Sequence, residues 1–444
     1  MKVLIVSYSY FPELTPRAFR WTAIAEQLAY LGHSVEVVCS SNPDQAMQEC
    51  INGVQIYRTG SNFRKNIKRW LFIDGSVNST SAREIKDNTV SIRGRIGGLL
   101  KSGYKNTIQK ILWPDFAAFW YFSALNVACQ LVKNKKFDIV VTVSLPYTGH
   151  LVGLTLKRRF GIRWLVDIGD PFSFMKKTPL NNASIFLGCN YRSESLVLNK
   201  ADAIVVTTEG TRLEYLSCFP LLMQEKIVVI PPVFSTPPKE ELTTPFFKVS
   251  NKIRLVFAGT LYSSIRSPSA LLKLFRFLLS TPLGPRLELH FFGIINDCKS
   301  YFDSYGDLLG SKIFLHGLIG RDEVISAMKG ANVLVNLGNL TEYQLPSKVV
   351  EYVMLKKPVL NITKIYSDSS LSFFSGFPGV CNINEYAAVN DMRELDRIKN
   401  FIANPPEISS QHIDELNQTH GIKAITESYL KLFLVTIIKD RFIL

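Results

Sequence analysis

One short segment, QLPSKVVE from Gln344 to Glu351, places a cation and a carboxylate at the expected start of a helix. Pro346 suits the first turn of a helix, where unpaired amides and a positive dipole attract anions. Lys348 adds a full positive charge there, and Glu351, three residues later, projects to the same side. Cations at such a corner can hold a diphosphate, and a carboxylate can accept hydrogen bonds from the paired hydroxyls of a ribose. The segment predicts a nucleotide diphosphate site that includes Pro346, Ser347, Lys348 and Glu351.

A second candidate group follows the apolar run from Ile253 to Ala258. Gly259-Thr260 comes directly after this run, and Arg266 a few residues later. A glycine at a strand end lets a ligand approach the backbone, and a nearby arginine can pair with a phosphate. Each part has a simpler explanation by itself: Arg266 could be a surface arginine, and Glu351 could pair with Lys348 on an exposed turn. Their combination and order favour a diphosphate site, and no cluster of Asp residues accompanies it to hold a metal.

The first half of the sequence alternates short β-branched runs with amphipathic segments. Residues 3–7 are expected to form a strand, 17–30 a helix with apolar residues at helical spacing, and 34–39 another strand. Further strands are expected at 138–144, 164–168, 203–207 and 227–230. This alternation is typical of a parallel, doubly wound sheet.

Prolines at 231–232 and 237–238 interrupt the alternation, as is typical of an interdomain linker. Beyond them, strands are expected at 253–258, 287–292, 312–316, 332–337 and 358–362. We therefore predict an N-terminal domain over 1–234, a linker over 235–250, a C-terminal domain over 251–415, and a helical segment over 416–444 that packs back toward the N-terminal domain. Two α/β domains of this kind are expected to face each other across a cleft, with ligands at the carboxyl ends of the strands.

The composition is that of a globular chain. Its 444 residues, of which 47% are hydrophobic and 20% charged, are too many for one core and exclude a disordered or fibrous protein. The seven scattered cysteines form no C-x-x-C pair, which indicates reduced thiols in a cytosol. Neither half carries G-x-G-x-x-G after its first strand, and G-x-x-x-x-G-K-[ST] does not occur. The absence of the first motif weakens the case for a nicotinamide-dependent enzyme, and the absence of the second excludes an ordinary P-loop kinase.

Much of the net charge of +14 comes from one region. Between residues 58 and 110 there are twelve Lys and Arg but only three Asp and Glu. We interpret 58–110 as a surface excursion that attracts an anionic partner, although a solvated face without a partner would look the same. Apolar residues within it, such as Phe63 and 70–73, favour an anionic membrane surface. No RNP1-type stacking motif is present, so we expect no nucleic acid partner.

A transmembrane helix is not expected. The longest apolar run near the C-terminus, 432–438, is far below the roughly 20 residues that a membrane span needs. The N-terminal sequence MKVLIVSYSYF is short, β-branched and without a small-residue cleavage site, so we interpret it as a buried strand rather than a signal peptide. We therefore expect a cytoplasmic protein, peripheral at the inner face of the cytoplasmic membrane.

Short motifs spread over nearly the whole chain carry a family resemblance. In the first half they are Tyr10-Phe11-Pro12-Glu13, Thr15-Pro16-Arg17, Gly32-His33-Ser34-Val35, Pro114-Asp115, Ser144-Leu145-Pro146 with His150, Trp164-Leu165-Val166-Asp167 with Asp170-Pro171, and Ala201-Asp202. In the second half they are Ala258-Gly259 with Arg266, Phe292-Gly293, His316-Gly317, Leu345 to Glu351, and Lys357-Pro358-Val359. In these motifs the chain resembles the GT-B glycosyltransferases of family 4, in the subgroup that builds bacterial O-antigen and capsular polysaccharides.

The resemblance implies two Rossmann-like domains and a retaining transfer from a nucleotide-diphosphate sugar, with no metal and no other cofactor. Glu351 matches the second glutamate of the family's E-x7-E motif, which holds the ribose. Arg266 takes the place of a phosphate-binding cation that is usually lysine. Fixed cations stabilise the leaving diphosphate, so Arg266 and Lys348 are candidate catalytic residues. The nucleotide base is expected beside the backbone from Gly317 to Arg321.

Two positions of the donor site depart from the family pattern. Thr260 stands where an arginine often follows the glycine, and Lys348 could supply the missing charge. The first glutamate of E-x7-E, which contacts the donor sugar, would fall at Tyr343, and the nearest acid is Glu342.

The acceptor side has four candidates. After the first strand, the chain lacks the glycine pair of many family members, and Arg17 and Arg20 could instead meet a phosphate or could be surface charges. His150 begins a helix after a strand, and Asp170 follows a strand, so each can point into the cleft or cap a helix. Both are candidate catalytic residues, although neither need act as a base, since the leaving phosphate can accept the proton.

The resulting hypothesis is sugar transfer from a nucleotide-diphosphate sugar to a polyprenyl-diphosphate-linked saccharide. Two alternatives stay open: a non-hydrolysing sugar-nucleotide epimerase of the same fold, and a catalytically silent GT-B scaffold. An epimerase would convert its substrate without an acceptor, and a scaffold would bind no sugar nucleotide.

Overall fold

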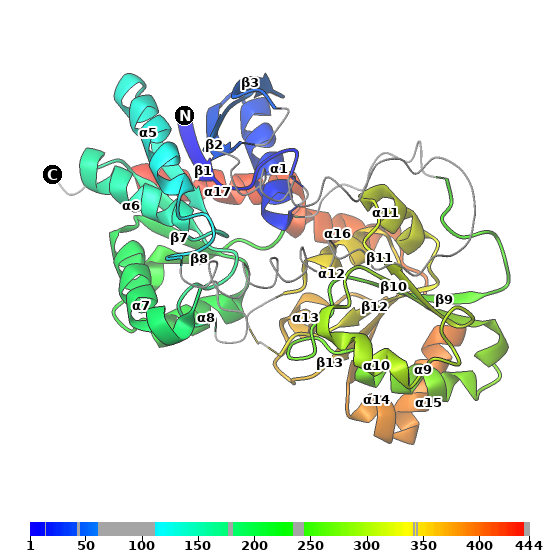
Figure 1. Cartoon of the computed structure of the whole chain (residues 1–444). Coiled ribbons are helices and arrows are strands. Elements are labelled where there is room, and N and C mark those ends of the chain that lie inside the picture. Colours follow the sequence, from blue (N-terminus) through cyan, green and yellow to red (C-terminus); the bar gives the residue numbers. More distant parts are fainter. Residues whose placement is uncertain are drawn as a thin grey trace, which may run out of the picture. The chain divides into compact units, whose positions relative to one another are not determined.

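The computed structural model describes residues 1–13, 15–41, 45–60, 112–175, 181–233, 244–340, 342 and 345–438. Within it the chain forms two compact units (Figure 1). The first comprises Met1–Val206, Leu216–Val228 and Ser428–Leu444, and the second comprises Thr207–Tyr215 and Val229–Glu427. Most of the predicted basic excursion, the first part of the predicted linker, and Tyr343 lie outside the described residues.

The first unit is built on one eight-stranded sheet of order β3-β4-β2-β1-β5-β6-β7-β8. From β4 to β7 the paired neighbours are parallel, whereas β3 is antiparallel to β4. The strands are β1 (Lys2–Ser7), β2 (Ser34–Ser40), β3 (Gln48–Ile51), β4 (Val54–Thr59), β5 (Ile139–Val143), β6 (Trp164–Asp167), β7 (Ala203–Val206) and β8 (Ile227–Val229). The strand order reverses between β1 and β5, and the carboxyl edge at such a reversal is where ligands bind in open α/β sheets.

Polar side chains cap the start of three helices of the first unit, α1 (Pro16–Tyr30), α6 (Thr148–Phe160) and α7 (Ala183–Lys200). The unit also contains α5 (Trp120–Asn134) and part of α8 (Glu209–Cys218). The Thr15 hydroxyl accepts the amide of Ala18 at the start of α1. The buried Asp115 carboxylate accepts the amide of Thr148 at 2.9 Å and its hydroxyl at 2.8 Å. Asp115 therefore fixes the start of α6, the helix that carries His150.

The second unit contains a fully parallel six-stranded sheet of order β11-β10-β9-β12-β13-β14. Its strands are β9 (Ile253–Ala258), β10 (Leu287–Phe292), β11 (Ile313–Gly317), β12 (Val333–Leu337), β13 (Val359–Thr363) and β14 (Val380–Asn384). Its helices are α9 (Ser269–Leu279), α10 (Lys299–Asp303), α11 (Arg321–Lys329), α12 (Ser347–Met354), α13 (Ser369–Phe373), α14 (Ala387–Asn390), α15 (Met392–Ala403), α16 (Ser410–His420) and the first part of α17 (Ile422–Ile438). The predicted strands of both halves are confirmed to within one or two residues, and β3, β4 and β14 are additional.

Side chains of β9 show how this sheet is covered on both faces. Leu255 and Phe257 belong to a core with apolar residues of α9, α14 and α15. Val256 and Ala258 belong to a separate core with residues of α11, α12 and α16. Because successive side chains of a strand point to opposite faces, both faces of β9 are buried and its carboxyl end is held rigidly.

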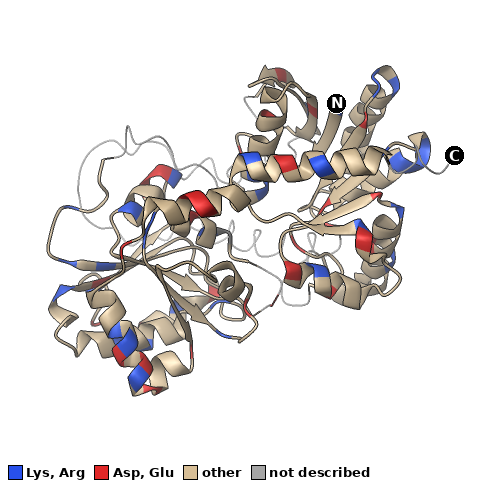
Figure 2. Cartoon of the chain, turned by 180° about the vertical axis from the view of Figure 1, so that it is seen from behind, with Lys and Arg blue, Asp and Glu red and all other residues tan. Residues whose placement is uncertain are grey.

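The last part of α17 belongs to the first unit. Tyr429, Phe433 and Thr436 are buried at helical spacing, whereas Leu434 and Val435 are exposed. Figure 2 shows basic and acidic residues in alternation along the visible side of this helix. In the sequence, Lys423, Glu427 and Lys431 are spaced four residues apart. Within the described ranges, none of the helices has both the length and the apolar character needed to cross a membrane.

Arg58 corrects the predicted start of the basic excursion. It lies in β4 with 3% of its surface exposed, forms an ion pair with Glu49, and donates to the backbone oxygens of Ala46 and Phe11. Its charge is therefore neutralised inside the fold and adds nothing to an exposed basic surface. Residues 61–110 lie outside the described residues, so the membrane-facing role of this region stays a prediction.

Candidate active site

Glycines line the carboxyl edge of the second sheet where its strand order reverses, between β9 and β12. Gly259 follows β9, Gly293 follows β10 and Gly338 follows β12. Gly293 has φ of +120°, and a Cβ there would lie 2.1 Å from the backbone oxygen of Gly259. Only glycine permits this approach, so the turn after β10 packs directly against the loop after β9. The edge therefore presents backbone that carries no side chain at the expected ligand position.

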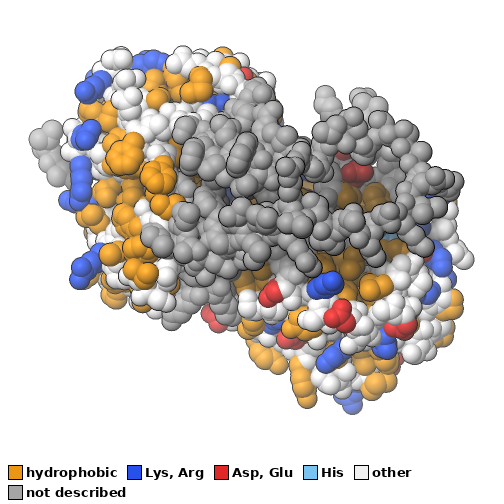
Figure 3. Space-filling view, viewed as in Figure 1, with side chains coloured by type: hydrophobic (Ala, Val, Ile, Leu, Met, Phe, Trp, Pro, Cys, Tyr) orange, Lys and Arg blue, Asp and Glu red, His pale blue; other side chains and the backbone are white. Residues whose placement is uncertain are grey.

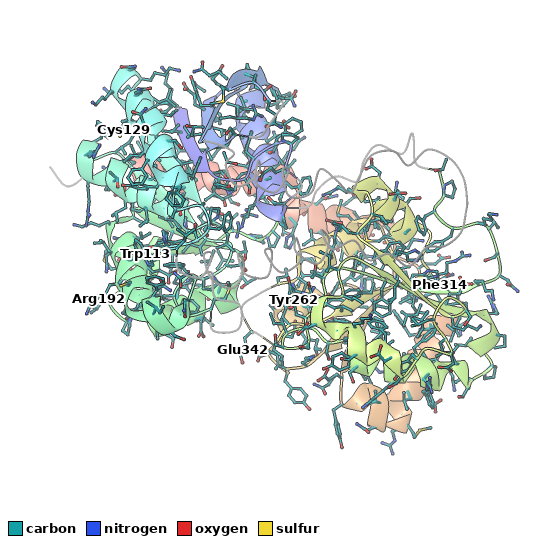
Figure 4. All side chains as sticks on the ribbon, in the orientation of Figure 1. Trp113, Cys129, Arg192, Tyr262, Phe314 and Glu342 are labelled. Atoms are coloured by element: carbon teal, nitrogen blue, oxygen red, sulfur yellow. The ribbon has the colours of Figure 1, made fainter. Side chains whose placement is uncertain are left out.

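The loop after β9 is held in a fixed shape. The amide of Arg266 donates to the backbone oxygen of Tyr262 at 2.8 Å, which closes a tight turn. The amide of Ser263 donates to the Asp297 carboxylate at 3.0 Å, which ties the turn to the neighbouring loop. Figure 4 labels Tyr262 in this turn. The position of Arg266 is thus set by backbone contacts before any ligand binds.

The guanidinium of Arg266 spans the reversal between β9 and β12. Its Nη2 donates to Asn339 Oδ1 at 2.8 Å, and its Nη1 would lie 3.4 Å from a Cβ added to Gly259. Its Nε is buried and has no hydrogen-bond partner among the described residues. Burial lowers the pKa of Arg266. The alternative of a simple surface arginine does not describe this side chain, which keeps a donor available at the edge of the sheet.

A buried carboxylate, Asp368, adds negative charge near Arg266. One of its oxygens accepts the amide of Ser370 at 2.8 Å and so caps α13. The other would lie 2.3 Å from a Cβ on Gly338. Burial raises the pKa of Asp368, and the positive charge of Arg266 acts against that shift. Asn339 and Asp368 are thus two site residues that the sequence did not predict.

Helix α12 begins at Ser347 directly after Pro346, as predicted. The Tyr352 hydroxyl accepts the amide of Ala258 at 3.1 Å and lies 3.2 Å from the oxygen of the same residue. Because Tyr352 is almost fully buried, this contact fixes α12 against the end of β9. The first turn of α12, with its positive dipole, therefore lies in the same part of the unit as Gly259 and Arg266.

Lys348 and Glu351 form an ion pair on α12. Lys348 Nζ lies 2.7 Å from Glu351 Oε2, and Arg321 Nη2 lies 4.0 Å from Glu351 Oε1. The ion pair between Lys348 and Glu351, which was the simpler explanation for these two residues, is therefore present. It does not lie on an exposed turn, however, because the Glu351 side chain is only 18% exposed. Two cations flank this carboxylate, and its oxygens can also accept hydrogen bonds from hydroxyl groups.

Three other residues were predicted to bind the sugar donor: Thr260, Gly317 and Glu342. Thr260 is partly buried beside Gly259, and Gly317 ends β11 with φ of +69°. Glu342 is exposed and accepts a hydrogen bond from the Ser367 hydroxyl at 2.6 Å. Figure 4 labels Glu342 on the loop that precedes α12. Its replacement of the glutamate expected at Tyr343 stays a prediction.

In the first unit, Arg17 lies at the carboxyl edge of the sheet. Its Nη1 donates to Asp167 Oδ1 at 2.8 Å, and the side chain is 15% exposed. A Cβ on Gly169 would lie 1.7 Å from Arg17 Nη2, so the guanidinium packs against the backbone there. Asp167, at the end of β6, thus holds Arg17 in place with one face partly open.

Arg20 has a different position from Arg17. It is 4% exposed, and its Nη2 donates to the Tyr429 hydroxyl at 3.0 Å. That hydroxyl also donates to Asp167. The alternative that Arg20 is a surface charge is wrong, because α17 covers it. Arg20 instead takes part in a buried network that ties α1, β6 and α17 together.

Asp170 is partly buried and follows Gly169 in the loop after β6. The segment after Pro171 is held by Glu194 of α7, which accepts the amides of Phe172 at 3.2 Å and Ser173 at 2.8 Å. The buried Glu194, and not Asp170, thus accepts these two backbone amides after Pro171.

His150 is 2% exposed and lies in the first turn of α6. Its Nδ1 is 2.8 Å from the Thr142 hydroxyl, and its Nε2 is buried without a hydrogen-bond partner in the described part of the chain. Because its side chain bonds β5 and Asp115 caps α6, His150 does not act as a helix cap. Burial lowers the pKa of His150 to about 3. The imidazole is therefore neutral at physiological pH.

Among the described residues, no three His, Cys, Asp or Glu side chains gather as metal ligands would. The expectation that the reaction needs no metal stays a prediction.

Comparisons with known proteins agree with this arrangement. Residues 104–232 match the model of the glycosyl transferase 4-like domain. Among curated protein sequences, none matches the chain significantly. Among solved structures, the chain is similar to the sucrose-phosphate synthase of Thermosynechococcus elongatus, with 12% identity, coverage of 99% of this chain and 100% of that chain, and a TM-score of 0.63.

Two further structures share the fold. WaaG, a glycosyltransferase involved in lipopolysaccharide biosynthesis, is 13% identical, with coverage of 94% of this chain and 100% of that chain and a TM-score of 0.51. The UDP-GlcNAc 2-epimerase of Methanocaldococcus jannaschii is also 13% identical, with coverage of 98% and 99% and a TM-score of 0.51. The two Rossmann-like units have the GT-B fold. With the matched domain, this fold supports a glycosyltransferase similar to family 4.

Proposed function

We propose that this protein transfers a sugar, with retention of configuration and without a metal, from a nucleotide-diphosphate sugar to a polyprenyl-diphosphate-linked saccharide. The reaction breaks the bond between the anomeric carbon and the donor phosphate oxygen, and forms a bond from that carbon to an acceptor hydroxyl oxygen. The hydroxyl proton passes to the leaving phosphate. The product would extend a bacterial surface polysaccharide such as O-antigen or capsule. The structural neighbour WaaG is a glycosyltransferase involved in lipopolysaccharide biosynthesis.

The observation that carries the proposal is the position of Arg266. A buried guanidinium, held by Asn339, keeps an unpartnered Nε at the strand reversal beside Gly259. A leaving diphosphate develops negative charge, and a fixed cation stabilises that charge without reorganisation. The start of α12, with Lys348 and Glu351, adds a positive helix end and a carboxylate for the ribose.

A binding screen tests the donor part of the proposal. Thermal unfolding of the full chain is followed with UDP-, GDP- and dTDP-sugars in the presence of EDTA. One nucleotide class is expected to raise the Tm, by an amount set by the ratio of its concentration to Kd. Free monosaccharides, which lack the diphosphate, serve as the control. If no nucleotide sugar raises the Tm, the scaffold alternative is favoured over the transferase.

We further propose that the first unit attaches to the anionic inner face of the cytoplasmic membrane. Phe119 and Phe122, near the start of α5, are 75% and 72% exposed, and Arg158 and Arg159 are exposed at the end of α6. Figure 3 shows hydrophobic side chains gathered over the region of α5 to α7, with Lys and Arg at its margin. Apolar side chains that insert beside cations are typical of a peripheral membrane surface.

Co-sedimentation with vesicles tests this attachment. Binding to vesicles that contain phosphatidylglycerol is expected to exceed binding to phosphatidylcholine vesicles and to fall as salt rises. The double variant Phe119→Ser and Phe122→Ser is expected to weaken binding, whereas Tyr366→Ser, at an exposed aromatic residue of the second unit, is the control. Equal binding to both vesicle types would contradict the electrostatic part.

A further inference from the structure

A chain of three buried side chains ends at His150. The indole Nε1 of Trp164 donates to the Thr142 hydroxyl oxygen at 2.9 Å, and that oxygen lies 2.8 Å from His150 Nδ1. Thr142 and Trp164 are fully buried and His150 is almost so. Because these side chains are buried, a donor or acceptor among them that has no partner in the protein stays unsatisfied until a ligand supplies one.

Counting donors assigns the proton of the imidazole. An indole nitrogen can only donate, so Thr142 accepts from Trp164 and has one hydrogen of its own to give. If His150 Nδ1 accepts that hydrogen, the imidazole proton lies on Nε2, and Nε2–H is the single unsatisfied group. If Nδ1 carried the proton, both the threonine hydrogen and the Nε2 lone pair would be unsatisfied. Since each buried unsatisfied group is costly, the first arrangement is favoured.

The fold makes specific room for this chain of contacts. A Cβ on Gly153 of α6 would lie 2.3 Å from Trp164 Nε1 and 2.5 Å from Thr142 Cγ2. Any larger residue at 153 would push the indole off the threonine. Gly149, one turn earlier on the same helix, would place a Cβ 3.1 Å from the backbone oxygen of Val143. The helix therefore packs closely enough on β5 for His150 to reach Thr142.

The charges near His150 come from Arg17 on α1 and Asp167 on β6, which form an ion pair with each other. Burial is the largest influence on the imidazole and lowers its pKa, so His150 is neutral and carries one proton. In the favoured arrangement, that proton lies on Nε2, the nitrogen left without a partner among the described residues.

We propose that Trp164 and Thr142 are positioning residues that hold His150 as the neutral Nε2–H tautomer, so that His150 donates a hydrogen bond to a substrate oxygen and does not accept a proton. The identity of that oxygen, on a sugar hydroxyl or a phosphate, rests on the proposed function. The tautomer itself does not.

Nitrogen NMR of the full-length protein, labelled with ¹⁵N-histidine, tests the tautomer. His150 is assigned by the loss of its signals in His150→Gln. At pH 7, its ring protons are expected to correlate with a protonated Nε2 and an unprotonated Nδ1. Thr142→Val is expected to shift the Nδ1 signal and mix the tautomers, and Thr142→Ser to restore the original pattern. Thr155→Val is the control, because this α6 hydroxyl bonds Tyr121 and not His150.

Protonation at Nδ1 in the unmodified protein would overturn the proposal even if Thr142→Val failed to fold. A tautomer unchanged by Thr142→Val would overturn the positioning role.

Activity separates a donor from a base. Glutamine can place an N–H near the position of Nε2 but cannot take up a proton at neutral pH. His150→Gln is therefore expected to keep kcat within about tenfold, while His150→Leu loses about 10²-fold, as for a missing transition-state donor. Equal losses in the two variants would overturn the donor role. If the unmodified protein transfers no sugar, the proposed function fails, and the NMR result still decides the tautomer.

Discussion

Replacing Arg266 with alanine is expected to lower kcat for sugar transfer by about 10²- to 10³-fold, because a fixed cation at the leaving diphosphate acts mainly in the transition state. Arg266→Lys is expected to recover part of the rate, because lysine keeps the positive charge. The recovery is incomplete because lysine lacks the planar guanidinium, which can contact Asn339 and a phosphate at the same time. Initial rates at saturating donor measure the effect.

The matched control for Arg266 is Arg276→Ala. Arg276 lies on α9 of the same unit, 50% exposed, and pairs with Asp307 at the surface. Its loss should leave the rate nearly unchanged, because exposed ion pairs contribute little. A rate for Arg266→Ala equal to that of this control would remove Arg266 from the site.

Replacing Glu351 with alanine is expected to abolish detectable transfer and to weaken donor binding about 10- to 100-fold, while the fold is kept. The physical reason is the loss of a carboxylate that accepts the ribose hydroxyls, since a hydrogen bond to a charged group contributes about 1.5–3 kcal/mol. Isothermal titration with the nucleotide sugar identified by the Tm screen measures Kd directly.

Two companion variants sharpen the Glu351 result. Glu394→Ala removes a partly exposed carboxylate of the same unit that pairs with Arg397 three residues later, and donor binding should not change. Lys348→Met removes the partner of Glu351. If Glu351 served only to pair with Lys348, Glu351→Ala and Lys348→Met would have equal effects, and adding the second change to the first would have none.

The sequence predicted most strands of both sheets, including the edge strands β8 and β11, but missed β3, β4 and β14. β9 and β10 are mainly apolar six-residue runs, and their bounds were predicted to the residue. The hairpin of β3 and β4 was missed, although its Asn52-Gly53 turn, with φ of +50° and +81°, carries a recognisable hairpin signal. The predicted excursion of 58–110 overlaps β4 only at its last two residues, Arg58 and Thr59.

The site could be predicted where its residues are close in sequence. Lys348 and Glu351 were found because helical spacing alone puts them on one side. Asn339 lies 73 residues from the Arg266 that it contacts, and the polar pair is brought together only by the strand reversal. Arg20 lies 409 residues from Tyr429, so its burial could not be inferred from neighbouring residues. Contacts of this kind depend on tertiary structure and leave no local pattern.

The most direct test of the central claim is the fate of an isotopically labelled nucleotide sugar incubated with and without a polyprenyl-diphosphate-linked saccharide. For a retaining glycosyltransferase, we expect that, only with the acceptor, the sugar moves to the lipid in its original anomeric configuration and one nucleoside diphosphate is released per sugar. Conversion of the nucleotide sugar into its epimer without any acceptor would instead identify an isomerase.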